Sequence, residues 1–397
     1  MATAVVDINI EDLPRDLQGL DGYLYILALV RFGGCPVGKI RVPVENGCVT
    51  AAQIRAALLE MDLSPLWNAW LAAYTGYDPV AGGQPPASVT VATCTRDRPE
   101  DLARCLAGVL NLPEDGQEIL VVDNHPQTDQ TRRLVQSYPR VRYIREDRPG
   151  LDVARNRALR EARGEVVAFI DDDAIPDPGW LRALVRHFAD PRVMAVTGLT
   201  MPGELETEAQ EMFERYSGFG RGFYRYTFNI NIMNPLVASR VGAGANMALR
   251  TSVLDRVGAF DEALDAGTPT QSGGDTEMFT RILRAGYSIT YEPAALNWHW
   301  HRRAWPDLRR VLYGYGVGAY AIWTRQLLRE GEFSVLRHSA AWWWKYQLPG
   351  LLRAILRPSS SPIPAQLLWD EIRGCLAGPW AYLRSSRSLS QGRKARA

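Results

Sequence analysis

Residues 164–180, GEVVAFIDDDAIPDPGW, constrain the fold more than any other stretch. The run from Val166 to Ile170 is apolar and rich in β-branched and aromatic residues, which is typical of a strand buried on both faces of a parallel sheet. Three carboxylates, Asp171, Asp172 and Asp173, follow it directly. They repel one another, but the carboxyl ends of parallel strands are where open α/β sheets bind ligands. Clustered carboxylates there favour a Mg²⁺ or Mn²⁺ site shared with substrate phosphates.

The surrounding sequence alternates between strand and helix patterns. We expect strands at residues 88–92, 118–122 and 141–144 and helices at 99–110, 128–137 and 151–163, which predicts a mostly parallel sheet. Polar clusters follow three strands, at residues 93–98, at Asp123 and at Asp171–Asp173, so they should share one edge of the sheet. Each cluster alone could be a solvated turn, since Asp and Asn are ordinary turn residues. Three on one edge favour a nucleotide site.

Several motifs in this region resemble a known family. The segments TVATCTRDRPEDLARCL, EILVVDN, GLDVARNRAL and FIDDDAIPDPGWL, and later VGAGANMALRTSVLDRVGAFDEAL and GGDTEMFTRILRAGYSITYEPAALNWHWHR, look like the successive motifs of family 2 glycosyltransferases. These are inverting enzymes of the GT-A fold, an α/β fold with a mostly parallel sheet flanked by helices. The resemblance covers about residues 87–303. It implies a nucleotide-diphospho-sugar donor, a hydroxyl acceptor and a Mn²⁺ or Mg²⁺ cofactor.

The resemblance also implies a role for each matching residue. Asp275 occupies the position of the general base, and Asp173 and His299 are expected on the metal ion. Gly274 stands where the family often has Glu, which leaves Asp275 as the obvious proton acceptor. The donor and acceptor side would include Gly244, Asn246 and Gly274. Nucleotide binding is expected from Thr93, Thr95, Arg96, Arg98, Asp123, Arg155, Asn156, Asp171 and Asp172.

The chemistry of sugar transfer agrees with these roles. A divalent ion stabilises the negative charge that develops on the leaving diphosphate, and a hydroxyl acceptor needs a carboxylate to take its proton. The residues alone leave two alternatives open. Asp275 could be only a helix N-cap, and His299 with His301 could belong to an aromatic core, although alternation places both on one face of a strand.

Charge is distributed unevenly along the chain. The formal total is +1, but from Arg302 onward there are 16 Lys or Arg and 5 Asp or Glu, against 29 and 39 before it. This predicts a basic helical extension over residues 304–397, with an amphipathic helix interrupted by glycines at 308–329 and a disordered end at 384–397. Seven of the twelve tryptophans lie in the extension. Such helices favour contact with an anionic membrane surface, a lid on the core or a dimer contact.

Residues 1–80 read as a separate α+β module without a catalytic constellation. Strands are expected at 23–32 and 38–44 around a Gly33-Gly34 turn, and helices at 50–60 and 66–74, followed by a linker at 77–86. Five scattered cysteines without a CxxC motif predict neither a disulfide framework nor a zinc site, so a cytoplasmic location is the default. We find no signal-peptide pattern and no run of 18 apolar residues, and therefore expect no membrane span.

We therefore expect an inverting, metal-dependent glycosyltransferase in cell-surface polysaccharide or glycolipid assembly, peripheral at the inner face of the membrane. Residues 213–234, dense in Tyr, Phe and Arg, are expected to form a mobile acceptor-side loop. Nucleic acid binding is not expected, because the overall charge is balanced. A sugar-phosphate nucleotidyltransferase is the alternative enzyme, but it would need a Gly-rich basic loop where residues 93–99 have none. A non-catalytic, membrane-associated assembly module is disfavoured by the intact carboxylates.

Overall fold

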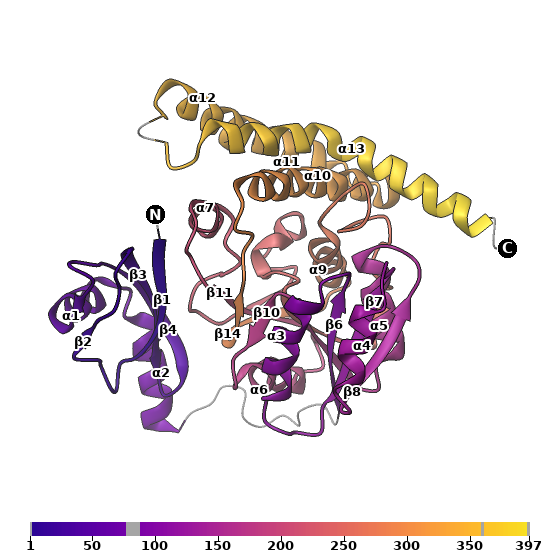
Figure 1. Cartoon of the computed structure of the whole chain (residues 1–397). Helices are drawn as coiled ribbons and strands as arrows, with labels where there is room; N and C mark the ends of the chain where they lie inside the picture. Colours follow the sequence, from indigo (N-terminus) through magenta and orange to yellow (C-terminus); the bar gives the residue numbers. More distant parts are fainter. Residues whose placement is uncertain (1, 77–87, 359–360, 395–397) are drawn as a thin grey trace.

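The computed structural model describes residues 2–76, 88–358 and 361–394. Figure 1 shows an N-terminal module beside a large α/β body, with long helices laid across one end of the body. The predicted linker at residues 77–86 lies outside the described residues. The mixed α/β class expected from the sequence is confirmed by a nine-stranded, mostly parallel sheet flanked by helices.

The N-terminal module is a three-stranded sheet covered by two helices. Gly33 and Gly34 have φ of 55° and 77°, which confirms the predicted turn between β3 and β4. The helix expected at residues 50–60 is α1, and Thr50 caps it in a capping box with Gln53. The first strand was not expected, and it pairs in parallel with β3. The elements are β1 (Ala2–Asn9), β2 (Asp16–Leu17), β3 (Tyr23–Phe32), β4 (Cys35–Pro43), β5 (Val49–Thr50), α1 (Ala51–Glu60) and α2 (Ser64–Thr75).

The body is built on a sheet of order β10-β14-β11-β13-β9-β6-β7-β8, with β12 paired to β14. Its first half alternates strands and helices as predicted: β6 (Val89–Thr95), α3 (Pro99–Leu110), β7 (Glu118–Asn124), α4 (Gln130–Gln136), β8 (Val141–Glu146), α5 (Leu151–Glu161) and β9 (Val166–Ile170). These four strands are parallel, and Thr95 is paired with Asp123 in the ladder. Their carboxyl ends therefore share one edge, which is the arrangement that the polar clusters predicted.

The second half adds the antiparallel pairings. Strand β13 runs antiparallel between β9 and β11, and β14 pairs with both β10 and β11. Apolar clusters cover both faces of the sheet, which explains why β9 carries no polar residue. The elements are β10 (Ala174–Pro176), α6 (Trp180–Val185), η1 (Arg186–Ala189), β11 (Val193–Pro202), α7 (Glu208–Ser217), β12 (Tyr226–Phe228), η2 (Pro235–Val241), β13 (Asn246–Arg250), α8 (Val253–Arg256), α9 (Gly274–Arg284) and β14 (Ser288–His299).

The module and the body share an apolar contact. Leu27 and Leu29 of β3 pack in one cluster with Leu199, Tyr291 and Leu296 of the body. Ion pairs flank this cluster, from Arg31 to Asp177 at 2.6 Å and from Arg41 to Glu211 at 3.0 Å. The module is thus held against β11, β14 and α7 rather than tethered by a linker alone.

The C-terminal extension consists of α10 (Trp305–Glu330), α11 (Ser334–Trp342), the π-turn η3 (Trp343–Gln347), α12 (Leu348–Leu356) and α13 (Ala365–Lys394). The prediction that glycines interrupt the first helix is wrong, because α10 is continuous. Its glycines allow close packing instead: a Cβ on Gly316 would overlap the backbone of Glu371 on α13. The predicted disorder is also wrong for residues 384–394, because α13 continues to Lys394. The last three residues of that prediction lie outside the described residues. In the described part of the chain, no helix is both long enough and apolar enough to span a bilayer.

Candidate active site

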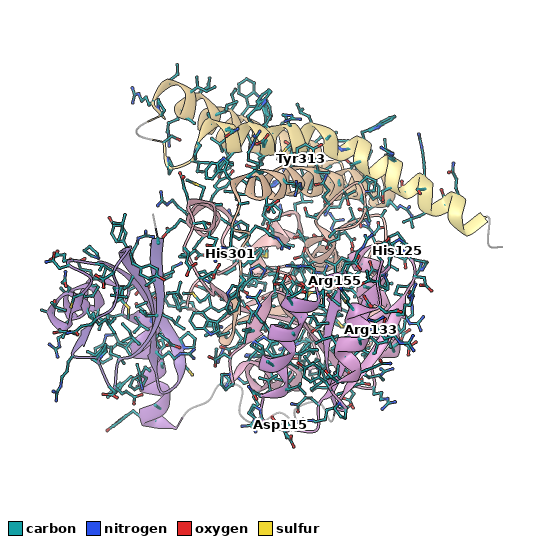
Figure 2. The ribbon with its side chains drawn as sticks, viewed as in Figure 1. Asp115, His125, Arg133, Arg155, His301 and Tyr313 are labelled. Carbon is teal, nitrogen blue, oxygen red and sulfur yellow. The ribbon has the colours of Figure 1, made fainter. Side chains whose placement is uncertain are left out.

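A cavity of ≈ 550 Å³ lies at the carboxyl edge of β6, β7 and β9, on the side that faces α10. One wall is polar and comes from this edge; it includes Thr95, Arg96, Arg98, Asn124 and Asp171–Asp173. The other wall is largely apolar and comes from α7, α10 and the loop after α7; it includes Phe213, Phe219, Leu308, Val311 and Tyr315. Arg155 lies at the same end of the sheet, whereas Asp115 lies at the opposite end (Figure 2).

Asp171, Asp173 and His299 form a group that could hold a divalent cation. One ligand atom from each lies within 4.8 Å of the others. His299 ends β14, and its Nε2 is 3.0 Å from Asp173 Oδ1. Two carboxylates and an imidazole suit Mn²⁺ well and Mg²⁺ acceptably. Asp173 and His299, which are 126 positions apart, were expected together from the family resemblance, and the structure brings them together. Asp171, which was expected to bind the nucleotide, joins them in this group.

Two arginines lie against the same carboxylates. Arg98 donates to Asp172 at 2.5 Å and to Asp173 at 2.8 Å, and Arg302 lies 3.5 Å from Asp173. Burial opposes ionisation of Asp173, but His299 and Arg98 hold the pKa of this carboxyl well below its usual range. Burial, and then the charge of Asp173, raises the pKa of Asp172 to about 7. The edge thus combines one firmly ionised carboxylate with cationic groups suited to phosphate oxygens.

Asp275 lies in the first turn of α9, beside this edge. The N-cap of α9 is Gly273, so Asp275 is not the cap of its helix. Its Oδ2 accepts a hydrogen bond from Gly244 N at 2.6 Å, and its Oδ1 accepts one from Thr276 N at 2.6 Å. Gln271 and Ser272, which precede α9, line the cavity. Asp275 is partly exposed but is not itself one of the lining residues. Backbone amides at the start of α9 and at Gly244 thus hold both oxygens of this carboxyl group.

A buried cluster of charged residues lies next to the backbone that holds Asp275. Arg155 Nη1 donates to Asp152 at 3.1 Å and to Asp265 at 2.7 Å. Burial, and then the charge of Asp265, raises the pKa of the Asp152 carboxyl. A Cβ on Gly244 would lie 2.8 Å from Arg155 Nη2 and 3.0 Å from Asp275 Oδ2. The cluster therefore fixes the backbone that holds Asp275.

This cluster also accounts for the glycine at 274. A Cβ on Gly274 would overlap the carboxylate of Asp152, and Gly274 N donates to Asp265 Oδ2 at 3.2 Å. The family that this sequence resembles often has Glu at the position of Gly274. Here the side chain of Asp152 occupies the space that a side chain at residue 274 would need. Sequence reasoning singled out neither Asp152 nor Asp265. For Asp152, the only sequence signal was an acid within the polar pattern of α5.

Three residues assigned to the site by sequence point into the packed interior. Thr93 Oγ1 lies 3.9 Å from Cys105 Sγ of α3. Asn156 uses both amide atoms on the backbone of Phe260, at 2.8 and 3.0 Å. Asn246 accepts from Trp180 Nε1 and donates to the backbone carbonyls of Leu199 and Ala295. They shape the loops and strands around the cavity, and their direct contact with a ligand stays a prediction.

Asp123 has a different environment. Its Oδ2 accepts from the Tyr143 hydroxyl at 2.8 Å, and its buried Oδ1 accepts no hydrogen bond from the described residues. Burial raises the pKa of this carboxyl. Asp123 does not itself line the cavity, but the next residue, Asn124, does.

The apolar wall of the cavity includes residues for which the sequence predicted a mobile loop. Residues 213–217, expected in a mobile loop, belong to α7, which begins at a capping box formed by Thr207 and Gln210. Phe213 packs on His301, with ring centroids 4.5 Å apart, and Phe219 lies 5.1 Å from His299. The aromatic surroundings expected for the two histidines thus exist beside the candidate metal group. The capping box was the signal that could have identified α7.

Comparison with known proteins supports a transferase. Residues 88–258 match the family model "Glycosyl transferase family 2". The match covers less than half of the chain and shows that this segment is similar to glycosyl transferase family 2. The matched segment contains the edge residues from Thr93 to Asp173, whereas Asp275 and His299 lie beyond the matched residues.

Named relatives agree with this assignment. A pre-mycofactocin glycosyltransferase of Mycobacterium tuberculosis (strain CDC 1551 / Oshkosh) is 30% identical over 175 residues, which are 44% of this chain and 35% of that protein. The glycosyltransferase AglE of Haloferax volcanii is 27% identical over 234 residues, 56% of this chain and 70% of AglE. The chain thus spans about a third of the mycobacterial relative. Among solved structures, a mannosyltransferase from Pyrobaculum calidifontis in complex with GDP-Man and Mn²⁺ matches with a TM-score of 0.44 and 20% identity, covering 83% of each chain.

Proposed function

We propose that this protein is an inverting, metal-dependent glycosyltransferase of family 2 that moves a sugar from a nucleotide-diphosphate donor to a hydroxyl acceptor. The observation that carries the proposal is the grouping of Asp171, Asp173 and His299 at the sheet edge beside which Asp275 also lies. A phosphate-binding cation and a proton acceptor are the two elements that such a transfer requires.

The residues present fit a divalent cation. Asp171, Asp173 and His299 would hold Mn²⁺ or Mg²⁺, which when bound supplies positive charge to the leaving diphosphate. Arg98 and Arg302 add fixed positive charge beside Asp173 and can pair with phosphate oxygens. The unused oxygen of Asp123 would accept a hydrogen bond from the base.

In the proposed reaction, Asp275 accepts the proton of the acceptor hydroxyl while that oxygen attacks the anomeric carbon. The bond from this carbon to the phosphate oxygen breaks, and its electron pair leaves with the diphosphate. A single displacement of this kind inverts the anomeric configuration. Gly244 N and Thr276 N hold Asp275 in place, because each donates to one of its oxygens at 2.6 Å.

A thermal-shift screen tests the proposal. UDP-, GDP- and dTDP-sugars are added with Mn²⁺ or with EDTA, and a matching donor at 100 times its Kd should stabilise the protein by about 2.7 kcal/mol. We expect one nucleotide series to raise Tm only in the presence of the ion. The proposal fails if no nucleotide diphosphate or nucleotide sugar shifts Tm with either Mn²⁺ or Mg²⁺.

We also propose that the protein acts in cell-surface polysaccharide or glycolipid assembly, at the inner face of the membrane. The excess of Lys and Arg after residue 302 supports this location, because anionic lipids attract basic segments. The largely apolar wall formed by α7 and α10 supports an acceptor that carries an apolar group beside its hydroxyl.

A further inference from the structure

The outer side of the C-terminal extension exposes an unusual number of large apolar side chains. Figure 1 shows α12 and α13 on the far side of α10 from the sheet. On α13, Trp369, Leu376 and Trp380 are 51%, 68% and 67% exposed. On the segment from α11 to α12, the exposed apolar residues are Phe333, Leu336, Trp342, Trp344, Tyr346, Leu352, Ile355 and Leu356. We call these eleven residues the outer apolar face.

The residues on α13 form one stripe that points away from the body. Gly374 and Gly378 meet the backbone of α10, and residues two positions apart on a helix differ by about 200°. Leu376 and Trp380 therefore face away from α10, and the exposed side chain of Arg373 lies in the same stripe. On α12, Ala354 is buried, whereas Leu352 and Leu356, each two positions away, are exposed. The apolar exposure thus follows from how these helices pack.

Charge on this surface is of one sign. Between Phe333 and Trp369 the sequence contains no Asp or Glu, but it contains Arg337, Lys345, Arg353 and Arg357. The only acids from Phe333 to the end are Asp370 and Glu371. Asp370 is 4% exposed and pairs with Arg309 at 2.6 Å, and Glu371 accepts a hydrogen bond from Tyr216 of α7. Both acids are therefore turned inward, and the exposed side carries only positive charge.

We propose that the outer apolar face docks on a lipid bilayer that contains anionic headgroups. Tryptophans with arginine and lysine on helices that do not cross the membrane are the composition of interfacial helices. The arrangement places α10 between the bilayer and the sheet, so the helix that lines the cavity is the helix under the membrane contact. This inference rests on the membrane location proposed above and specifies the surface that makes the contact.

The test measures binding of the full chain to vesicles by co-sedimentation. Vesicles of phosphatidylcholine with about 30% phosphatidylglycerol are compared with pure phosphatidylcholine. Attraction near an anionic surface is worth roughly fivefold in the binding constant per basic residue. We expect binding to the anionic vesicles that weakens as salt is raised, since the charges are exposed. Equal binding to both kinds of vesicle, or none to either, would overturn the proposal without the need for any variant.

Matched variants locate the contact. Trp344→Ser with Trp380→Ser should weaken vesicle binding at least about tenfold, because each removes a large apolar side chain from the contact. Trp67→Ser on α2 is the control, since Trp67 is 61% exposed but lies on the N-terminal module. Arg337→Gln, Lys345→Gln and Arg353→Gln together should cost on the order of 100-fold on anionic vesicles. If Trp67→Ser weakens binding as much as the double variant does, the outer apolar face is not the contact.

Two readouts keep this inference separate from the proposed chemistry and from self-association. The Tm shift with nucleotide sugar and Mn²⁺ should be the same in all variants, so loss of vesicle binding alone reports on the surface. A wild type that binds vesicles but shows no nucleotide shift would refute the chemistry and leave the docking intact. A dimer in light scattering that the double tryptophan variant dissociates, without vesicle binding by the wild type, would show that the face pairs two copies and would overturn the proposal.

Discussion

Gly274→Ala is a small change that probes the support of the active site. The structure leaves no room for a Cβ at this position, because it would overlap the Asp152 carboxylate. Asp152 is fully buried and is held by Arg155 at 3.1 Å, so it cannot move aside into solvent. The alanine must therefore either displace Asp152 from Arg155 or shift the start of α9, which carries Asp275.

The size of the effect follows from these contacts. Separating the members of a buried ion pair costs about 3–5 kcal/mol. Unfolding of a 397-residue chain has an entropy of about 0.8 kcal/mol per degree, so Tm should fall by roughly 4–6 °C. A displacement of α9 also moves Asp275, the proposed proton acceptor, and misplacement by about 1 Å can lower the rate about 100-fold.

The assay compares thermal unfolding and turnover of Gly274→Ala with those of Gly179→Ala. Gly179 precedes α6, and a Cβ there would meet only Asp177 Oδ1 at 3.9 Å, so this control should behave like the wild type. Asp152→Gly combined with Gly274→Ala removes the overlap, and the alanine should then cost much less in Tm than it does alone. A single Gly274→Ala variant with unchanged Tm and turnover would refute the proposed packing.

Two further predictions concern Glu292, a structural carboxylate, and Asp173, a carboxylate of the candidate metal group. Burial opposes ionisation of Glu292, but His187 and Arg225 lower its pKa from 4.5 to about 2. The ionised Glu292 therefore stabilises the folded protein above pH 4.5, and this contribution is lost as the pH falls toward 2. The shift in pKa corresponds to about 3 kcal/mol of folding stability, so Glu292→Gln should lower Tm at pH 7 by about 4 °C. Below pH 4.5 the difference in Tm between variant and wild type should shrink progressively. A difference that stays constant with pH would contradict this prediction. Asp173→Ala should abolish the Mn²⁺-dependent part of nucleotide binding in calorimetry, whereas unchanged heats with and without Mn²⁺ would remove Asp173 from the metal group.

The sequence predicted the part of the fold that depends on local pattern. Strand β9 begins and ends where its apolar run does, and the edge carrying Asp171–Asp173 follows from the alternation of strands and helices. The approach of His299 to Asp173 was expected only from the family resemblance, because pairing of β14 with β10 and β11 is not visible in the local sequence.

The features that the sequence did not predict depend on contacts between segments that are distant in the chain. Thr93 and Thr95 look equivalent in sequence and share one face of β6. Their partners differ, because Thr93 is covered by Cys105 of α3, whereas Thr95, at the end of the strand, donates a hydrogen bond to Asp172. The glycines of α10 read as interruptions because their neighbour, α13, begins about 50 residues later. Asp265 adopts a φ of 72° to reach Arg155, and no sequence pattern identifies such a position.

The central claim is that Asp275 accepts the proton of the nucleophile at the edge where the metal group holds the donor. Asp275→Asn keeps the size of the side chain and an oxygen for one of the two amides that hold it. The measurement is release of nucleoside diphosphate from the donor selected by the Tm screen, together with the Tm shift that the same donor produces with Mn²⁺. We predict a loss of about 100- to 10,000-fold in release with an unchanged shift. Release at the wild-type rate from a variant that binds the donor normally would contradict the account.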